Sequence, residues 1–292
     1  MEVTPEYAQE FVDVPGGRLG VQIYPEPEGV TGAPVVVICP AMGVRARYYR
    51  PFAVALREAG LAVVVADLRG TGASTPAPSR ADRYGYAELV TDVGAVLESL
   101  KSRLDGRTRL LLGHSLGGQA ALLHVALAEE TMVDGLALLA VGVPYWRSYS
   151  DLRRYGLLPY SQGIAAVSTV LGVWPGWGFG GRQARGVIRD WAYTARTGRF
   201  PILDGVDPEV AVRSVRTPVL AVSMDNDQFT PHETLDYLCG MLTAAPVHRE
   251  RYTTAEAGGP LDHFTWVRAS APLAARVAGF AAGLTAVDPQ IS

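Results

Sequence analysis

Cysteine is scarce in this sequence, with Cys39 and Cys239 the two present in 292 residues. Two cysteines are too few for the disulfide framework of a small secreted domain, and their positions do not match the ligand spacing of a zinc site. We therefore expect both thiols to be structural. We expect neither a metal ion nor another cofactor.

The sequence also lacks an excess of positive charge and long apolar runs. Its 26 Lys and Arg residues are outweighed by 29 Asp and Glu residues, which leaves a net charge of -3. This balance provides no electrostatic reason to expect nucleic acid or an anionic membrane as a partner. No apolar run approaches the length of a transmembrane helix, and the acidic residues 1–10 lack the pattern of a secretory signal. We expect a cytoplasmic protein with no membrane partner.

What the sequence does contain is a series of short apolar runs that alternate with helical patterns. The runs lie at residues 35–39, 61–66, 110–112, 133–141 and 218–224. Continuous runs of this kind are typical of strands buried on both faces, so they predict a mostly parallel, doubly wound α/β sheet. Two alternating segments within residues 11–24 predict an antiparallel hairpin at the N-terminal side. The length fits one such domain with an insertion.

The alternation is interrupted between the fourth and fifth runs. Residues 144–206 contain many aromatic side chains and no buried strand pattern. Because a structureless loop of this length is uncommon in a compact domain, they predict an inserted, largely helical cap. Residues 1–143 and 207–292 would then form the core domain. Most of the aromatic rings should pack the cap, while Trp146, Trp177 and Trp191 are expected to bind substrate.

The most informative stretch is residues 108–121, TRLLLGHSLGGQAA, which reads as a strand, a sharp turn and a helix. Its G-x-S-x-G core matches a nucleophile elbow, where a serine is held on a strained turn at the carboxyl end of a strand. Gly113 and Gly117 are expected because a Cβ would collide where strand and helix pass each other. The elbow presents Ser115 as the nucleophile, with the amide of Leu116 facing a developing oxyanion.

A serine nucleophile needs a base, and the base needs an acid that holds its tautomer. Of the five histidines, His263 lies in a loop after the last strand candidate, residues 247–253, where it can swing back over the elbow. The other four are less suitable as the base. His114 adjoins the serine and must point away from it, and His124 lies inside a predicted helix. His232 begins a helix, and His248 lies at the start of the last strand candidate. Asp225 and Asp227 both follow the strand at 218–224, and either can supply the acid.

A second oxyanion donor should come from the loop after the first parallel strand. The sequence there is Cys39-Pro40-Ala41-Met42-Gly43, and we expect the backbone amide of Met42 to act with that of Leu116.

Five motifs together resemble one superfamily: PAMGV at 40–44, DLRGTGAS at 67–74, GHSLGG at 113–118, DQFTP at 227–231 and DHFTW at 262–266. The chain resembles the α/β-hydrolase fold superfamily, in particular bacterial serine hydrolases and esterases related to the S33 aminopeptidase and monoacylglycerol-lipase-like group. In similar sequences the acid is followed by two variable residues, a small or β-branched residue and proline. That frame favours Asp227 over Asp225. Many relatives have His-Gly where this chain has Pro40-Ala41, which leaves the second oxyanion donor less certain.

The resemblance implies a serine hydrolase that cleaves an ester or thioester of a small, largely apolar acyl substrate through an acyl-enzyme on Ser115. One alternative is an acyltransferase or cyclising, thioesterase-like enzyme with the same triad. Another is a non-catalytic ligand-binding protein on the same fold. The sequence does not decide whether the protein is a monomer or a homodimer.

Overall fold

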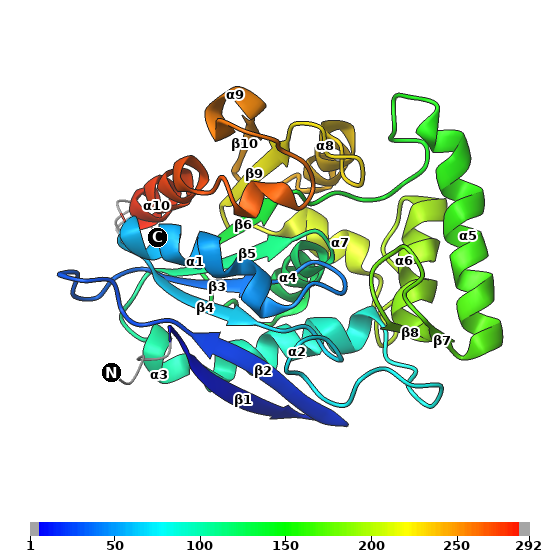
Figure 1. The fold of residues 1–292 in the computed structure, drawn as a ribbon, viewed down its shortest axis with the longest axis horizontal. Coiled ribbons are helices and arrows are strands. Elements are labelled where there is room, and N and C mark those ends of the chain that lie inside the picture. Colours follow the sequence, from blue (N-terminus) through cyan, green and yellow to red (C-terminus); the bar gives the residue numbers. More distant parts are fainter. Residues whose placement is uncertain (1–5, 286–292) are drawn as a thin grey trace.

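An eight-stranded sheet runs through the computed structural model, which describes residues 6–285 (Figure 1). The strand order is β1-β2-β4-β3-β5-β6-β9-β10. The strands are β1 (Ala8–Val14), β2 (Gly17–Ile23), β3 (Val35–Cys39), β4 (Ala62–Ala66), β5 (Arg109–His114), β6 (Gly135–Leu139), β9 (Val219–Met224) and β10 (Val247–Tyr252). Strand β1 pairs antiparallel with β2, and β2 pairs antiparallel with β4. All later pairs are parallel, so the predicted sheet and its N-terminal hairpin are confirmed.

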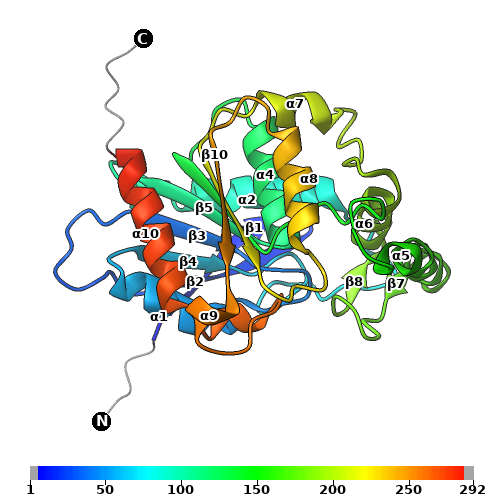
Figure 2. The same cartoon turned by 90° about the horizontal axis from the view of Figure 1, so that it is seen from above.

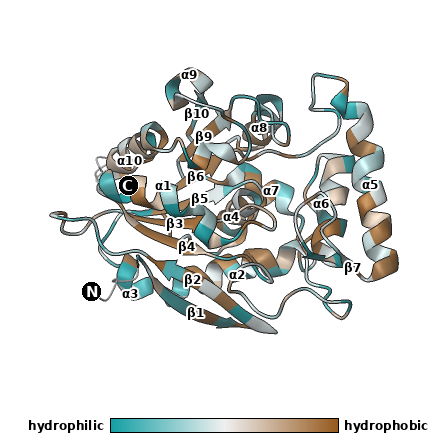
Figure 3. Cartoon of the chain, viewed as in Figure 1, coloured by the Kyte–Doolittle hydropathy of each residue, from teal (hydrophilic) through white to brown (hydrophobic). Residues whose placement is uncertain are grey.

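The central strands are apolar because both of their faces are covered. Every residue of β3, β4, β6 and β9 is buried, and Figure 3 shows their hydrophobic colouring against the more polar edge strand β1. Valine and leucine fit this environment, since a parallel strand between two helical layers meets no water.

Helices cover both faces of the sheet (Figure 2). One face carries α1 (Arg50–Glu58), preceded by the 3-10 turn η1 (Ala46–Tyr49), and α10 (Ala271–Thr285). The other face carries α2 (Tyr86–Ser99), α4 (Leu116–Leu127), α7 (Pro208–Ser214) and α8 (His232–Met241). The remaining short helices are α3 (Lys101–Leu104), α9 (Thr254–Ala257) and η2 (Thr265–Val267). Each layer forms its own hydrophobic core with the sheet.

The segment between β6 and β9 contains α5 (Arg153–Leu171) and α6 (Arg185–Thr197), which lie at one end of the molecule (Figures 1 and 2). A short antiparallel pair, β7 (Val173–Trp174) and β8 (Gln183–Ala184), joins these helices. The segment is therefore largely helical, with a small buried hairpin that the sequence pattern did not predict. The division into a core of 1–143 and 207–292 and a cap of 144–206 stays a prediction.

The strand register brings several loops to one edge of the sheet. Cys39 of β3 pairs with Gly113 of β5, and His114 pairs with Leu139 of β6. Because these strands run parallel, the loops that follow them meet at their carboxyl ends, which is where ligands bind in open α/β sheets. None of the helices in residues 6–285 combines the length and apolarity needed to cross a bilayer.

Candidate active site

Ser115 occupies the turn between β5 and α4 in a strained conformation. Its φ is 52° and its ψ is −121°, values that non-glycine residues adopt rarely. A Cβ on Gly113 would lie 2.1 Å from the Cα of Gly118, so strand and helix approach too closely for any other residue. A Cβ on Gly117 would lie 2.2 Å from the carbonyl oxygen of Cys39, the last residue of β3. The elbow expected from the sequence thus has the geometry that its glycines predict.

His263 is buried and forms a hydrogen bond with Asp227. The Nδ1 atom of His263 lies 2.8 Å from Oδ2 of Asp227, although 36 residues separate them in sequence. Asp227 follows β9, and His263 lies in the loop between α9 and η2. With Nδ1 donating to the carboxylate, the imidazole keeps Nε2 free to accept a proton.

The Asp227 carboxylate is held by the loop that follows it. Its Oδ1 accepts hydrogen bonds from the amides of Phe229 (2.8 Å) and Thr230 (2.7 Å). The hydroxyl of Thr230 lies 2.8 Å from Oδ2. These hydrogen bonds fix the direction of the carboxylate towards His263.

Asp225, the alternative acid, faces a different set of partners. It forms an ion pair with Arg251 at 2.6 Å and accepts a hydrogen bond from the amide of Thr254. Partial burial opposes these contacts, but the Thr254 amide and Arg251 hold its pKa below the ordinary value. The structure therefore brings Asp227, and not Asp225, to the imidazole of His263.

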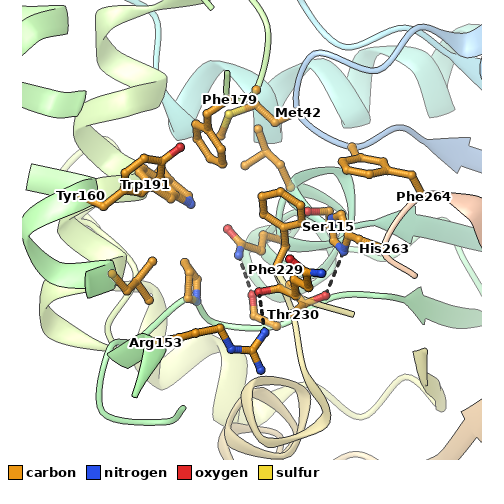
Figure 4. A pocket seen from close by; sticks show the side chains of 18 of the residues that line it. Met42, Ser115, Arg153, Tyr160, Phe179, Trp191, Phe229, Thr230, His263 and Phe264 are labelled. Carbon is orange, nitrogen blue, oxygen red and sulfur yellow. Dashed lines mark hydrogen bonds between the residues drawn. The ribbon is translucent and has the colours of Figure 1, made fainter. Parts of the chain in front are cut away.

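Ser115 and His263 line a single cavity of about 590 Å³ (Figure 4). The His263 ring lies 4.8 Å from the ring of His114, the residue directly before Ser115. The structure thus brings the sequence-predicted serine, histidine and aspartate together from three separate loops.

His114 points away from the cavity and connects the elbow to the loop after β3. Its Nδ1 lies 2.7 Å from the hydroxyl of Tyr49, which also accepts a hydrogen bond of 2.8 Å from the amide of Ala41. Burial raises the pKa of Tyr49, so the hydroxyl stays protonated while it shares a hydrogen bond with Nδ1 of His114. Burial, assisted by the neighbouring His263, lowers the pKa of His114 well below its ordinary value. A neutral His114 therefore helps to hold the Ala41-Met42 loop.

The two expected oxyanion donors border the same cavity. Leu116 is the first residue of α4, and Met42 lies in the loop after β3. Amides at a helix N-terminus carry partial positive charge and suit a developing anion. Gly43, directly after Met42, packs so closely that a Cβ there would lie 2.2 Å from the carbonyl oxygen of Gly180. The loop between β7 and β8 therefore rests on the loop that contains Met42.

The cavity walls are mainly apolar and include rings from several elements. Trp191 of α6 is one of them, in a tilted contact with Phe179 at 4.5 Å between ring centroids. The other walls include Met42, Leu116, Leu157, Tyr160, Phe229 and Phe264 (Figure 4). Polar side chains at the cavity include Gln119, Arg153 and Thr230.

The prediction of three substrate-binding tryptophans needs correction, because neither Trp146 nor Trp177 lines this cavity. Trp177 is 67% exposed, and its ring packs edge-on against Trp174 outside the cavity. Trp146 is half-buried, with the guanidinium of Arg147 over its ring at 4.8 Å. Aromatic density alone did not distinguish rings that face the cavity from rings that pack the segment around it.

Phe229 and Phe264 border the cavity but were not singled out from the sequence. Each directly adjoins the acid–base pair, since Phe229 lies two residues after Asp227 and Phe264 follows His263. Their rings lie 5.1 Å and 4.7 Å from the His263 ring. Their places within the DQFTP and DHFTW motifs were the available signal, because residues beside a catalytic group line its site.

Within residues 6–285, no group of three or more His, Cys, Asp or Glu side chains is arranged to hold a metal ion. Cys39 and Cys239 are free and buried, and burial raises the pKa of Cys39 to about 12 and that of Cys239 to about 11. Both thiols are therefore un-ionised at neutral pH.

Comparison with known proteins agrees with this geometry. Residues 32–205 match the family described as serine aminopeptidase, S33. "Putative carbamate hydrolase RutD" of Variovorax paradoxus (strain S110) is 34% identical over 115 residues, which span 39% of this chain and 40% of that protein.

Two solved structures share the fold at low sequence identity. A soluble variant of monoglyceride lipase from Saccharomyces cerevisiae, in complex with a substrate analogue, has a TM-score of 0.71 at 12% identity, with 96% of each chain covered. The thioesterase domain from the curacin biosynthetic pathway has a TM-score of 0.60 at 17% identity, with 93% of this chain and 99% of that chain covered. Because the family match covers more than half of the sequence and the sheet has the matching topology, the chain belongs to the S33 serine aminopeptidase family of α/β hydrolases.

Proposed function

We propose that this protein is a serine hydrolase that cleaves an ester or thioester of a small, largely apolar substrate through an acyl-enzyme on Ser115. The observation that carries the proposal is the 2.8 Å hydrogen bond between His263 Nδ1 and Asp227 Oδ2, in the cavity that Ser115 lines. A merely structural histidine has no reason to be oriented by a buried carboxylate beside a serine on a strained turn.

In the proposed mechanism, His263 accepts the Ser115 proton at Nε2 while the Ser115 oxygen bonds to the acyl carbon. Asp227 stabilises the resulting imidazolium through the Nδ1 hydrogen bond. The amides of Leu116 and Met42 donate to the oxyanion of the tetrahedral intermediate. The intermediate breaks the bond to the leaving group, which takes the proton from His263. Water then attacks the acyl-enzyme by the same route and releases the acid.

Apolar substrates are favoured by the walls of the cavity. Its volume of about 590 Å³ suits a small organic molecule, and aromatic and aliphatic side chains provide most of its lining. Each methylene buried there contributes about 0.8 kcal/mol to binding. Two proteins with the same fold, a monoglyceride lipase and a thioesterase domain, support hydrolysis of an acyl bond.

Acyl transfer or cyclisation by the same residues is the second candidate, favoured by the apolar lining and by the β7–β8 loop that rests on Gly43. A cavity that excludes water allows another alcohol or amine to capture the acyl-enzyme. Product analysis with and without a nucleophilic acceptor distinguishes transfer from hydrolysis.

Labelling with a fluorophosphonate probe, combined with a screen of p-nitrophenyl esters of graded chain length, tests the proposal. Peptide and lactone substrates belong in the same screen. We expect Ser115→Ala to lose labelling and to lose kcat on the order of 10⁶-fold, the size of a triad knockout. Ser214→Ala, on the exposed side of α7, is the matched control and should behave as wild type.

Activity of Ser115→Ala within a few-fold of wild type would remove Ser115 from the mechanism. Absence of labelling in the folded wild-type protein would instead favour a non-catalytic ligand-binding protein.

A further inference from the structure

A second cavity lies beside the candidate active site and differs from it in charge. It has a volume of about 800 Å³, and we call it the basic groove. It is lined by Tyr7, Gly43, Val44, Arg45, Arg47, Tyr48, Arg50, Pro51, Phe264, Val267 and Arg268. Four of these are arginines, and no Asp or Glu in the described part of the chain lines the groove. Such clustering is notable in a chain whose net charge is -3.

Most of this positive charge is not neutralised by neighbouring side chains. Arg50 forms an ion pair with Glu6. The guanidinium groups of Arg45, Arg47 and Arg268 make no hydrogen bond or ion pair with another described residue, and all three residues are exposed. A guanidinium group without a carboxylate partner offers its forked donors to an external anion, so these three arginines can bind one.

The carboxylates close to the groove are engaged by backbone amides. Asp67 is buried and accepts hydrogen bonds from the amides of Ala46 and Ala73. Asp262 accepts from the amides of Phe264 and Thr265. Neither carboxylate forms an ion pair with a groove arginine. Asp67 interacts electrostatically with Arg45 and Arg47 but makes no direct contact with them, so their guanidinium donors stay open to an external anion.

The basic groove adjoins the catalytic cavity at Phe264, which lines both. The Phe264 ring packs edge-on against His263 at 4.7 Å, and its carbonyl oxygen accepts a 2.9 Å hydrogen bond from the hydroxyl of Tyr48 in the groove. Gly43 of the groove directly follows Met42 of the cavity. The two cavities therefore share a wall at Phe264, on the His263 side of the site.

We propose that the basic groove binds phosphate groups on the leaving group of the substrate, an inference that rests on the proposed function. The proton that His263 takes from Ser115 goes to the departing atom, so the leaving group lies on the His263 side. The Ser115 oxygen first bonds to the acyl carbon, and the tetrahedral intermediate then breaks its carbon–sulfur or carbon–oxygen bond to the leaving group, which takes the proton from His263. The phosphates are unchanged. The apolar cavity then holds the acyl chain.

Phosphate matches the groove better than a single carboxylate does. Three unpaired guanidinium groups offer several positive charges, and one phosphate monoester supplies close to two negative charges with three acceptor oxygens. Guanidinium forks bind phosphate oxygens in bidentate geometry. A pyrophosphate or a nucleotide phosphate would pair with more of the groove's guanidinium groups than one monoester would.

Two matched substrate series test the proposal and separate its possible sources. The thioester series compares acyl-pantetheine, acyl-phosphopantetheine and acyl-coenzyme A, which share one thioester; the first two differ only in one phosphate, and coenzyme A adds further phosphates together with an adenosine. The oxygen-ester series compares a monoacylglycerol with the corresponding acylglycerol 3-phosphate. We expect kcat/KM to rise with phosphate number in at least one series, and the gain to shrink as ionic strength increases.

Arg47→Gln/Arg268→Gln should lower kcat/KM for the phosphorylated substrate about tenfold, the loss expected if each exposed guanidinium contributes a few-fold. It should leave the uncharged substrate of the same series unchanged. Arg216→Gln is the control, because this exposed arginine lies before the amino end of β9 and does not line the groove. A loss that is equal for charged and uncharged substrates would overturn the proposal, as would equal rates for all members of both series.

The proposed function can fail separately. If no substrate is cleaved, the hydrolase proposal fails, whereas binding in the groove is still measurable by calorimetry with coenzyme A. Weaker binding by Arg47→Gln/Arg268→Gln than by Arg216→Gln would then support the phosphate site, and equal or undetectable binding would reject it.

Discussion

The hydroxyl oxygen of Thr230 lies 2.8 Å from Oδ2 of Asp227, the carboxylate oxygen that also contacts His263. The same hydroxyl lies 3.2 Å from Nδ1 of His263 and 2.9 Å from the carbonyl oxygen of Ala140, the residue that follows β6. Thr230 therefore ties the acid–base pair to the neighbouring strand, and we regard it as a positioning residue.

Thr230→Val should lower kcat roughly tenfold or more with little change in KM, because a hydrogen bond to a charged group contributes about 1.5–3 kcal/mol. Steady-state kinetics with a p-nitrophenyl ester would measure both constants. Thr230→Ser keeps the hydroxyl and should recover most of the rate. A wild-type kcat in folded Thr230→Val would show that the hydroxyl does not position the pair, and a Thr230→Ser variant as slow as Thr230→Val would show that the hydroxyl alone is not sufficient.

Asp227→Asn should damage catalysis far more than Asp225→Asn. The first substitution replaces the carboxylate that orients His263 and should reduce kcat by about 10⁴-fold, the size seen for the equivalent change in a serine protease triad. Asp225 contacts Arg251 and Thr254 on a different side of the loop. Parallel kcat measurements on the two variants decide the assignment. The reverse ranking would transfer the acid role to Asp225, and two mild losses would exclude both.

Trp191→Ala should change the dependence of kcat/KM on acyl chain length, because the indole forms part of the cavity wall. The enlarged cavity should favour longer chains. Since Trp191 is also packed in the core, Tyr160→Ala provides a second variant at a cavity residue that is 48% exposed and less important for folding.

The matched control is Trp177→Ala, which removes an exposed indole outside the cavity and should leave the chain-length profile as in wild type. A p-nitrophenyl ester series from acetate upwards measures the profile. If small polar esters are the best substrates and neither cavity variant alters the profile, the cavity does not select the acyl group.

Stability should decrease as the pH falls below about 6.5, the ordinary pKa of histidine, in part because of His114. Its pKa is well below that value in the folded protein, since burial disfavours the charged ring. The unfolded chain therefore binds a proton that the folded chain does not, so acid favours unfolding. Because of this residue, the free energy of unfolding should fall by up to about 1.4 kcal/mol for each pH unit below pH 6.5.

Urea unfolding at pH 5 to 8 measures this slope. His114→Gln should be less stable at neutral pH, because the substitution disturbs the contact with Tyr49, but its stability should fall less steeply with acid. His248→Gln, at an exposed histidine, should keep the wild-type slope. An unchanged slope in His114→Gln would show that the ring is not kept neutral by the fold.

The local pattern of the sequence determined the strands and the elbow. Runs such as 35–39 and 61–66 are so apolar that they can only be buried on both faces. The backbone around Ser115 is packed so closely that only glycine fits at Gly113 and Gly117. Ser115 and His263 could be predicted for the same reason, because each depends on a motif of adjacent residues. Each of these features depends on a few neighbouring residues, so the local sequence is enough to predict it.

Tertiary structure decided the features that depend on which way a side chain points. Asp225 and Asp227 are two residues apart, and the loop directs one to Arg251 and the other to His263. Among the expected tryptophans, α6 turns Trp191 to the cavity, whereas Trp146 and Trp177 face elsewhere. The basic groove assembles residues from the chain start, from 43–51 and from 264–268. Packing between distant segments sets such directions. The DQFTP motif favoured Asp227, but no local pattern separated the tryptophans or indicated the groove.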